Sequence, residues 1–600
     1  MILSGLDDLW VDCCYIASRL APARKRNDPA IVPPPGNPAA LKEALIALWV
    51  PAWREDAVIA RMIAHNVASI RYARYHIFVG TYPNDEATLD VLREIESTYP
   101  NLHVSLTPHD GPTSKADNLN WIYQNLCLVE ERINETFDIV VVHDSEDLIH
   151  PEEFRWLNHY CRDFDFVQIP VLALPTPWYE FTHGVYCEEF AETQQKDLPT
   201  RNRMGGFAPS CGVGTGYRRD ALAKLAASES NHLFEPDSLT EDYLNGLRMH
   251  RLGMRQIYLP VEWVNDQPVA TREFFPRKFH AAVRQRTRWV TGIALQTWQK
   301  IGWSRSWREN YWFWRDRKGI LGNPLSLCAN FALIAGYFGY VPPLTEPTIF
   351  AAACGLIFQT IRLTSRIYFT GLIYGAPFAL LAPFRLTWSN LINTLATLCA
   401  LQRFALSRWR SEPLVWLKTE HAYPNRQALN PYSRTLAEVL VDSGALTSEQ
   451  LEAVQASRPG DKRLGEHLID QSLITYTQLY QALSILSGYP TTEFAIEDID
   501  IGIARSLPRS LMLEAKIQPI RFVKNCTVIA TSEVPSDSLL PSLRRFTSID
   551  PEIVLVTPEN LAAIRNFVES NQSARIESCP TRAAVLSALE SLPQVPPKTP

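Results

Sequence analysis

One short stretch constrains the fold of this chain more than any other: an apolar run that breaks into a cluster of acids. Ile139–Val142 is long enough for one buried strand, and Asp144, Glu146 and Asp147 follow it with His143 beside them. In open α/β sheets, loops at the carboxyl ends of strands bind ligands. Carboxylates at this spacing suit Mg²⁺ or Mn²⁺ carrying a diphosphate. A solvated acidic turn is the alternative.

Strands and helices are expected to alternate on both sides of this stretch. Apolar runs of strand length occur at Ala44–Trp49, His76–Gly80, Leu102–Leu106 and Phe166–Leu172. Segments with helical spacing separate most of them. This alternation predicts an α/β domain with a parallel, doubly wound sheet.

Two helix starts carry polar groups that suit a ligand site. Lys115 and Asp117 lie in the first turn of a helix beginning near Ser114. Lys115 can reach a phosphate and Asp117 a ribose or base edge, although Asp is common at helix starts anyway. Glu241 and Asp242 lie in the first turn of a later helix that Thr240 can cap. A general base there needs a water-poor pocket and a substrate hydroxyl within reach.

A glycine-rich segment and a basic helix complete the candidate site. Gly205–Gly216 is interpreted as a flexible wall for an acceptor, or as a plain surface loop. The segment Arg277–Trp289 has helical spacing and many arginines, which predicts an amphipathic helix on an anionic membrane surface. Gln285 and Arg288 are three residues apart and share one face of that helix.

Membrane segments are expected between Ile320 and Gln402. Ile320–Val341 has no charged residue and is long enough to span a bilayer, and the basic residues before it place its start in the cytoplasm. Arg362 and Arg366 would be costly against lipid, so we expect them at an interface or facing protein. Three further apolar runs follow: Pro347–Ile361, Ile367–Phe384 and Leu386–Gln402. Two or four crossings would leave both flanking domains in the cytoplasm.

Composition narrows the class of protein. The 11 cysteines include no C-x-x-C pair, which indicates reduced thiols rather than a disulfide framework or a zinc ribbon. The net charge of −6 gives no case for a nucleic-acid partner. The first residues contain several aspartates and no signal-peptide pattern.

The C-terminal part contains an internal repeat. Leu436–Leu451 resembles Leu464–Leu479 at a spacing of about 28 residues, which predicts two matching helix-turn-helix units. A small α+β unit is expected after the repeat, with Pro519 confining its first strand to a sheet edge. The strands expected there are Ile517–Val523, Thr527–Ala530 and Ile553–Val556.

Five segments occur in order between Pro51 and Trp289: PAWRED, SKADNLN, HDSED, LTED and QRTRW. This order resembles the processive-type family-2 glycosyltransferases, which are related to cellulose and chitin synthases. The resemblance implies the GT-A fold and inverting transfer, with Mg²⁺ or Mn²⁺, from a nucleotide-sugar donor, expected to be a UDP-sugar. It also implies a polysaccharide or lipid-linked acceptor and a multi-pass location in the bacterial inner membrane.

The resemblance also implies roles for individual residues. Asp144 and Glu146 match the metal-binding D-x-D pattern, but the sequence here is D-x-E-D, so Asp147 is an alternative ligand. Asp242, with Glu241 beside it, matches the catalytic base. The residues implied in nucleotide binding are Ala52, Glu55, Lys115 and Asp117. The residues matching the Q-x-x-R-W motif, which holds the acceptor and diphosphate, are Gln285, Arg288 and Trp289.

Residues from about Arg434 to Phe567 resemble the N-terminal domain of type II secretion ATPases (the MshEN type), which binds cyclic di-GMP. The second repeat keeps Arg463-Leu464-Gly465, whereas the first has Thr435-Leu436-Ala437. The missing arginine and glycine would remove a stacking or phosphate contact. Weak cyclic di-GMP binding, docking of a partner and plain packing all stay open.

We therefore expect six regions, and two functions from different classes. A receptor or scaffold with little catalytic activity, in a surface-polysaccharide export or phage-adsorption system with an outer-membrane partner, is the alternative to a transferase. The intact Asp117, Asp144 and Asp242 favour the transferase. The family often has a membrane helix before its catalytic domain, and this chain begins near that point. The regions are 1–40 (N-terminal segment and linker), 41–310 (GT-A domain with interfacial helix), 311–410 (transmembrane region), 411–433 (linker), 434–570 (MshEN-like domain) and 571–600 (loose tail).

Overall fold

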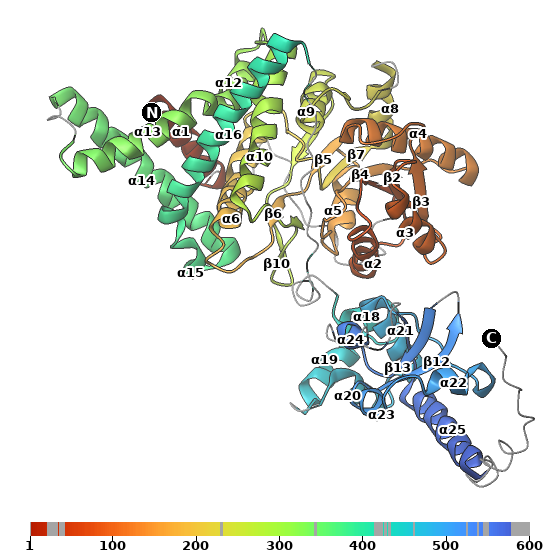
Figure 1. The fold of residues 1–600 in the computed structure, drawn as a ribbon. Helices are drawn as coiled ribbons and strands as arrows, with labels where there is room; N and C mark the ends of the chain where they lie inside the picture. The colour runs from red at the N-terminus through yellow and green to blue at the C-terminus, as the bar shows by residue number, and fades with distance from the viewer. Residues whose placement is uncertain are drawn as a thin grey trace, which may run out of the picture. The chain divides into compact units, whose positions relative to one another are not determined.

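The chain forms two compact units, Met1–Tyr432 and Ser433–Pro600. The computed structural model describes residues 2–20, 34, 42–228, 232–340, 345–412, 414, 424, 429, 434–459, 462–523, 526–536, 539–543, 546 and 551–577. The part of the expected region 1–40 after Leu20 and the expected linker 411–433 lie almost entirely outside these residues, as does the tail after Glu577. Each unit is described by itself below (Figure 1).

A seven-stranded mixed sheet organises the first unit (Figure 1). In spatial order its strands are β3 (Leu102–Leu106), β2 (Tyr75–Thr81), β1 (Ile46–Pro51), β4 (Ile139–Val142), β7 (Thr215–Arg218), β5 (Phe166–Gln168) and β8 (Gln256–Tyr258). The expectation of an all-parallel sheet is wrong at β7, which runs antiparallel to β4 and β5. It follows the glycine-rich segment, where Gly212 and Gly214 have φ of 81° and 61°.

The run expected as one strand, Phe166–Leu172, is two strands. After β5 the chain leaves the main sheet, and β6 (Val171–Ala173) pairs instead with β11 (Thr271–Glu273). Pro170 lies at the break and has no N–H to donate to a ladder. The other short strands are β9 (Trp263–Val264) and β10 (Gln267–Pro268).

Alternating side chains of the central strand explain why helices cover both faces of the sheet. Ile46 and Leu48 belong to the apolar core on the side of α2, α3 and α5. Ala47 and Trp49 belong to the core on the side of α4 and α8. Successive residues of a strand point to opposite faces, so β1 is buried on both. The covering helices are α2 (Ile59–Ser69), α3 (Glu86–Glu96), α4 (Lys115–Ile133), α5 (Glu153–Tyr160) and α8 (Arg219–Ser228).

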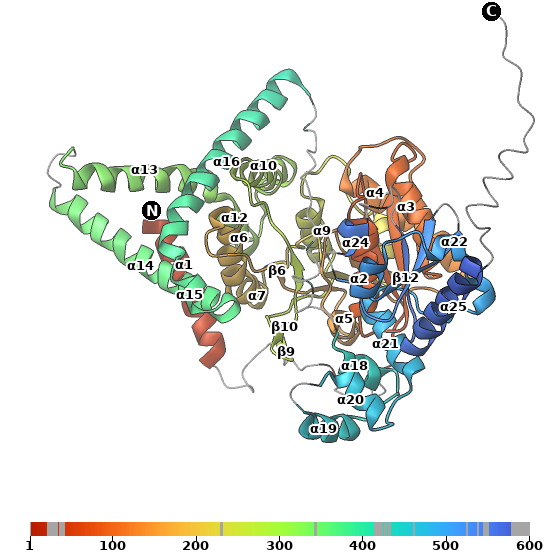
Figure 2. The same ribbon diagram turned by 60° about the horizontal axis from the view of Figure 1, so that its bottom comes forward.

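The remaining helices of the first unit lie to one side of the sheet (Figures 1 and 2). They are α1 (Ile2–Leu20), α6 (Phe181–Glu192), the π-helical turn η3 (Thr193–Asp197), α7 (Leu198–Arg203), α9 (Glu241–Arg251), α10 (Phe279–Trp289), the π-helical turn η4 (Val290–Gln296), α11 (Thr297–Ile301), α12 (Trp307–Arg317), α13 (Gly319–Tyr337), α14 (Glu346–Tyr374), α15 (Ala376–Ala379) and α16 (Ala382–Arg410). Among the described residues, α13 and α14 are long and apolar enough to cross a membrane.

The four apolar runs expected from the sequence do not form four separate spans. One helix, α14, contains Pro347–Ile361 and also the start of Ile367–Phe384. The run Leu386–Gln402 belongs to α16, which packs on α6 and α10. Arg366 faces protein, as expected, and forms an ion pair with Glu192 at 3.0 Å. Arg385, which lies between the last two of these runs, is fully buried and paired with Glu188.

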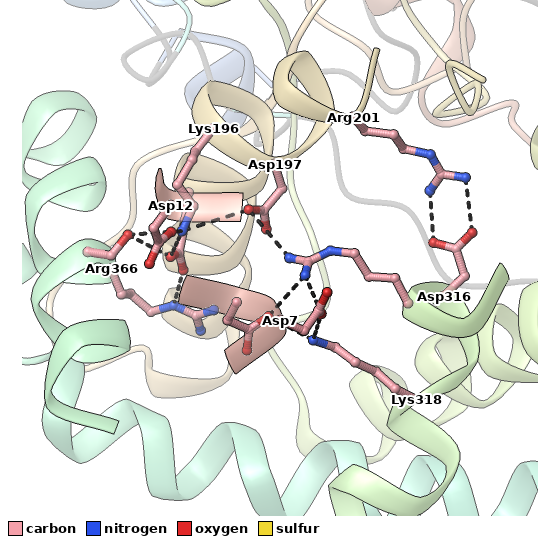
Figure 3. A network of polar contacts seen from close by, with 12 residues as sticks. Asp7, Asp12, Lys196, Asp197, Arg201, Asp316, Lys318 and Arg366 are labelled. Carbon is pink, nitrogen blue, oxygen red and sulfur yellow. Dashed lines mark hydrogen bonds and ion pairs between the residues drawn. The ribbon is translucent and has the colours of Figure 1, made fainter. Parts of the chain in front are cut away.

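The first residues form helix α1. Its aspartates pair with cations far along the chain: Asp7 lies 2.6 Å from the Lys318 ammonium, and Asp12 lies 2.6 Å from that of Lys196 (Figure 3). Both lysines are also held by other acids. These pairs fix α1 against η3 and the junction of α12 and α13.

In the second unit the predicted repeat is confirmed. Each half is a pair of helices, and the second helix of each pair begins with a capping box, Thr447 with Gln450 and Thr475 with Gln478. Pro519 lies on the edge strand of the sheet β12-β13-β14, as predicted. The elements are α18 (Leu436–Asp442), α19 (Ser448–Ser457), α20 (Leu464–Asp470), α21 (Tyr476–Ser487), η6 (Ile496–Asp498), α22 (Ile501–Ala504), α23 (Arg509–Glu514), β12 (Ile517–Val523), β13 (Cys526–Thr531), α24 (Leu539–Leu543), β14 (Glu552–Leu555) and α25 (Pro558–Glu577). Helix α25 extends beyond the boundary expected at residue 570.

Candidate active site

A pocket at the carboxyl ends of β1 and β4 brings together most of the candidate residues. Its walls come from the loops after these strands, the first turns of α4 and α9, and one face of α10. Parallel strands deliver their loops to one edge of the sheet. The candidate residues that line it are Ala52, Glu55, Lys115, Asp144, Glu146, Glu241, Asp242, Gln285, Arg288 and Trp289. Asp117 and Asp147 lie outside this lining.

A buried histidine holds the loop after β4 in shape. His143 Nδ1 lies 2.9 Å from Asp147 Oδ2, and His143 Nε2 lies 2.8 Å from Glu153 Oε1. Burial alone would lower the pKa of His143, but the two carboxylates, Glu153 first, raise it to about 9. The Asp144 N–H also donates to Asp147 at 3.0 Å. This placement argues against Asp147 as a metal ligand, because its fully buried carboxylate serves the loop.

Lys115 ties the acidic loop to the rest of the pocket. Its ammonium lies 2.5 Å from Asp144 Oδ1 and donates to the Gly212 carbonyl at 3.1 Å. Ser114 caps α4 by accepting from the Asp117 N–H, which fixes the first turn. Burial opposes the charge on Lys115, but Asp144 and Glu241 outweigh it and raise the pKa of Lys115. The lysine is therefore a permanent positive charge.

The first turn of α9 places two acids side by side in the pocket. Burial, followed by the charge of Asp242, raises the pKa of Glu241 to about 7. Burial also raises the pKa of Asp242, against the opposing effect of Lys115. Asp242 Oδ1 accepts from the Tyr243 N–H at 2.7 Å, which leaves Oδ2 facing Gly212. Within the described part of the chain, Thr240 does not cap α9 with its side chain, because it packs against Gly292 instead.

Helix α10 has two different faces. Gln285, Arg288 and Trp289 line the pocket. Arg286 points the other way, into the protein, where it forms a 2.7 Å ion pair with Glu189 and donates to Asn393 at 2.6 Å. The expectation that α10 lies on a membrane surface with all its arginines is therefore wrong for Arg286. A buried partner supplied by α6 could not be read from the local pattern.

Several pocket residues were missed from the sequence. Gly212 lies so close to the acids that a Cβ there would meet Asp242 Oδ2 at 2.7 Å, and its φ of 81° also favours glycine. The glycine-rich pattern signalled the segment but not this contact. Trp53 and Tyr82 form one wall, and Glu273 and Phe275 form another. No local motif marked these four.

Asp117 faces a neighbouring groove. Its carboxylate accepts from Thr113 Oγ1 at 2.7 Å and lies 3.3 Å from His109 Nε2. Thr113 and Ser114 line both this groove and the pocket. The groove that holds Asp117 and the pocket that holds Lys115 therefore form one continuous polar surface.

The donor set of the pocket fits a divalent ion that arrives with a diphosphate. Asp144 and Glu146 both line it. Among the described residues, no group of three or more His, Cys, Asp or Glu side chains is gathered to hold a metal alone. Mg²⁺ typically binds through one or two carboxylates plus substrate phosphates and water. Two hard oxygen ligands beside Lys115 match that requirement.

In the second unit, the candidate regulatory residues have different environments. The side chain of Arg463 is 77% exposed and lies 4.0 Å from Glu533. Leu464 is partly buried in the apolar core of the repeat. A Cβ on Gly465 would meet Leu479 at 2.9 Å and Leu436 at 3.4 Å. Close packing against Leu479 in the same half of the repeat, and against Leu436 of the other half, therefore explains Gly465.

Comparison with known proteins places the chain in a family. Residues 43–292 match the family model described as Glycosyltransferase like family 2. The chain is 33% identical over 588 residues to bacteriophage adsorption protein B of Escherichia coli (strain K12), covering 93% of this chain and 78% of that protein. Bacteriophage N4 adsorption protein B of Escherichia coli O157:H7 matches to the same extent.

Solved structures also resemble parts of the chain. The mannosyltransferase PcManGT from Pyrobaculum calidifontis, in complex with GDP-Man and Mn²⁺, matches 67% of this chain and 97% of its own, at 16% identity and a TM-score of 0.42. MshE with cdg matches 22% of this chain and 96% of its own, at 24% identity and a TM-score of 0.20. From the family match and the relatives, the chain belongs to the family of bacteriophage adsorption protein B and contains a family-2 glycosyltransferase domain with a GT-A-like fold.

Proposed function

We propose that this protein transfers a sugar, with inversion, from a nucleotide-diphospho-sugar to an acceptor hydroxyl at the cytoplasmic face of the bacterial inner membrane. One observation carries the proposal. Four groups of residues that are distant in the sequence, represented by Lys115, Asp144, Asp242 and Arg288, meet in a single pocket. A decayed site in a scaffold protein would have no reason to keep this set together.

The donor end of the pocket suits a diphosphate. Lys115 and Arg288 supply positive charge, and Trp53 and Tyr82 offer aromatic surface. Asp144 and Glu146 would hold Mg²⁺ or Mn²⁺, which when bound supplies further charge to the leaving diphosphate. Asp117, in the adjoining groove, is available to the ribose or base. The sugar would then lie between the acidic loop and α9.

Asp242 is the proposed general base. It is partly buried beside Lys115, which counteracts the burial penalty and favours the ionised form. Glu241, whose pKa is raised to about 7, holds a proton more readily and makes the local field dependent on pH. Removal of the acceptor proton by Asp242 as the hydroxyl attacks opposite the diphosphate gives inversion. Positioning both substrates supplies much of the remaining rate enhancement.

The acceptor is proposed to be a polysaccharide or a lipid-linked sugar. Helix α10 contributes Gln285, Arg288 and Trp289 to the pocket and packs against α16 on its other side. The same helical region contains α13 and α14, the two described helices that could cross a membrane. The pocket and the proposed membrane anchor are therefore built on adjoining elements.

The test is turnover of nucleotide-sugars by membranes that contain the full chain, with and without Mn²⁺. Wild type is expected to consume one class of donor in a metal-dependent way. Asp144→Ala is expected to lose both metal-dependent donor binding and turnover. Equal nucleotide-diphosphate affinity with and without Mn²⁺ in wild type and variant would show that the acids form only a solvated turn. No turnover of any donor by wild type would favour the scaffold.

We also propose that the second unit binds cyclic di-GMP weakly. The alternative is that it docks an export partner. The exposed guanidinium of Arg463 supports a reachable ligand contact. Calorimetry on the full chain with cyclic di-GMP, comparing wild type and Arg463→Ala, tests this. Sub-micromolar binding would refute the argument from the degenerate first repeat.

A further inference from the structure

A second polar cavity lies among the helices next to the proposed membrane anchor. It has a volume of about 460 Å³ and is lined by α1, η3, α12, α13, α14 and α16. Five basic and four acidic side chains face it: Arg201, Arg315, Lys318, Arg362, Arg366, Asp8, Glu189, Asp197 and Asp316. None of them belongs to the sugar-transfer pocket.

The acids of this cavity are already engaged. Asp8 lies 2.7 Å from the Lys318 ammonium, Glu189 lies 2.7 Å from Arg286, and Asp316 lies 2.8 Å from Arg201. Figure 3 shows the paired side chains of Arg201 with Asp316 and of Lys318 with its acids. Asp197 lies 3.7 Å from Lys196 and 3.8 Å from Arg315.

Two arginines on one helix differ in this respect. Arg366 is buried and paired with Glu192. Arg362, one turn earlier on α14, is exposed to the cavity and makes no hydrogen bond or ion pair with any residue that the structure describes. A positive charge in an apolar helix is costly unless it meets a counter-charge. The charge of Arg362 acts on Asp8 and Glu192 from a distance, but neither acid contacts it as Glu192 contacts Arg366.

The position of Arg362 along α14 indicates where its partner would come from. Arg362 directly follows the apolar run Pro347–Ile361, which rises about 22 Å along a helix. It lies near the cytoplasmic start of α13, because Lys318 and Asp8 line the same cavity. This is the level at which the hydrocarbon ends and lipid phosphates begin.

We propose that this cavity binds the phosphate group of an anionic phospholipid from the cytoplasmic leaflet, with Arg362 as its charge partner. Gln359, three residues before Arg362, and Asn390 on α16 also line it and offer amide donors to phosphate oxygens. Basic pockets between membrane helices on the cytoplasmic side suit such head groups. The proposal rests on the membrane location of α13 and α14 and not on sugar transfer.

Two glycines keep the cavity open. A Cβ on Gly322 or Gly355 would meet no atom within 4 Å, and both glycines line the cavity. Glycine is otherwise unfavourable inside a helix, by about 1 kcal/mol relative to alanine. Gly355→Leu would therefore fill the cavity without a clash at Cβ.

The experiment is native mass spectrometry of the full chain purified from membranes, with added phosphatidylglycerol. Wild type is expected to retain one lipid, and Arg362→Gln and Gly355→Leu to lower its affinity at least about tenfold, the loss expected for one charge-assisted contact. Arg403→Gln is the matched control, because Arg403 lies in α16 outside the cavity lining. It is expected to bind like wild type.

Further measurements distinguish a phospholipid from free phosphate as the ligand, and test the dependence on the membrane. Equal lipid retention by wild type, Arg362→Gln and Gly355→Leu overturns the proposal. Displacement of the lipid by inorganic phosphate alone overturns the assignment to a phospholipid. Donor turnover measured on the same samples is expected to persist in Arg362→Gln. Loss of turnover in wild type would count against the transferase only, and absence of wild type from the membrane fraction would remove the basis of this site.

Discussion

In two clusters of enclosed carboxylates in the first unit, neighbouring cations offset the effect of burial to different extents. In the sugar-transfer pocket, burial outweighs the charges of Lys115 and Arg288, and the pKa of Glu241 rises to about 7. Among the helices beside it, burial also works to raise the pKa of Glu189, but Arg286 and Arg366 outweigh it and lower that pKa to about 2. Two cations act on the acids in each cluster, so the difference lies in direct contact: Glu189 lies 2.7 Å from Arg286, whereas the ammonium of Lys115 is in contact with Asp144.

The comparison shows what distinguishes a reactive acid from a structural one. Glu189 has two arginines and accepts a hydrogen bond from Ser389 at 2.6 Å, so its charge is fully compensated. Asp242 shares its lysine with Asp144, which takes the closer contact. An under-compensated carboxylate gains by taking up a proton, which is the property of a general base. A carboxylate whose charge is fully compensated by cations instead holds helices together.

The largest effect is expected for Asp242→Asn. The amide cannot accept the acceptor proton, so turnover should fall by roughly 10²- to 10⁴-fold, while donor binding, measured by calorimetry, persists. Glu241→Gln is the matched control on the neighbouring residue and should keep more activity. Near-normal turnover in Asp242→Asn with saturating metal would show that Asp242 is not the general base. The two clusters would then not differ in reactivity.

The next effect is expected for Glu189→Gln, on stability. The change leaves Arg286 without its ion-pair partner in a buried site, and breaking such a pair costs about 3 to 5 kcal/mol. Thermal unfolding of purified protein at pH 7 measures it. Asp220→Asn is the control, because Asp220 pairs with Arg218 at an exposed position, where such pairs contribute about 1 kcal/mol or less. Equal losses in both variants would contradict a special role for the buried cluster.

A smaller effect is a difference in pH dependence between the clusters. The folded-state pKa of Glu241 is raised above its ordinary value of 4.5, so its contribution to stability is present below that value and is lost as the pH rises towards 7. The folded-state pKa of Glu189 is lowered, so its contribution is present above 4.5 and is lost as the pH falls towards 2. Each shift corresponds to about 3 kcal/mol at most.

Unfolding temperatures of wild type, Glu241→Gln and Glu189→Gln between pH 4 and 8 measure this difference. Relative to Glu241→Gln, wild type should become less stable between pH 4.5 and 7. Relative to Glu189→Gln, the advantage of wild type should stay constant over that range and shrink only below it. Two parallel curves would show that the clusters do not differ.

Local patterns predicted much of the fold and most of the pocket. The bounds of β3, β4 and β12 agree with those expected, because each is a short apolar run between turn residues. Lys115, Asp144 and Asp242 were found because each sits where an element begins or ends, and the sheet brings such positions together. The other candidate residues of the pocket were predicted from the order of the short motifs along the chain.

What the sequence did not reveal depends on distant partners. Asp147 looked like its neighbours, but it points inward to His143, which Glu153 holds from the other side. Arg286 was predicted to face the membrane, but it forms an ion pair with Glu189 of α6. Asp7 on α1 is satisfied by Lys318, more than three hundred residues away. The reversed strand β7 likewise follows from a glycine-rich loop whose course no periodicity records.

The strand order of the first unit has a consequence for how the chain is made. β5 is synthesised directly after β4 and α5, yet its neighbours in the sheet are β7 and β8. At the usual pace of synthesis, the chain between β5 and β7 takes roughly 2 to 9 s to appear. During that interval, β5 has no neighbouring strand of the sheet to pair with. The last strand of the sheet, β8, still emerges well before α13, so the sheet can close before the first of the two described helices that could cross a membrane is made.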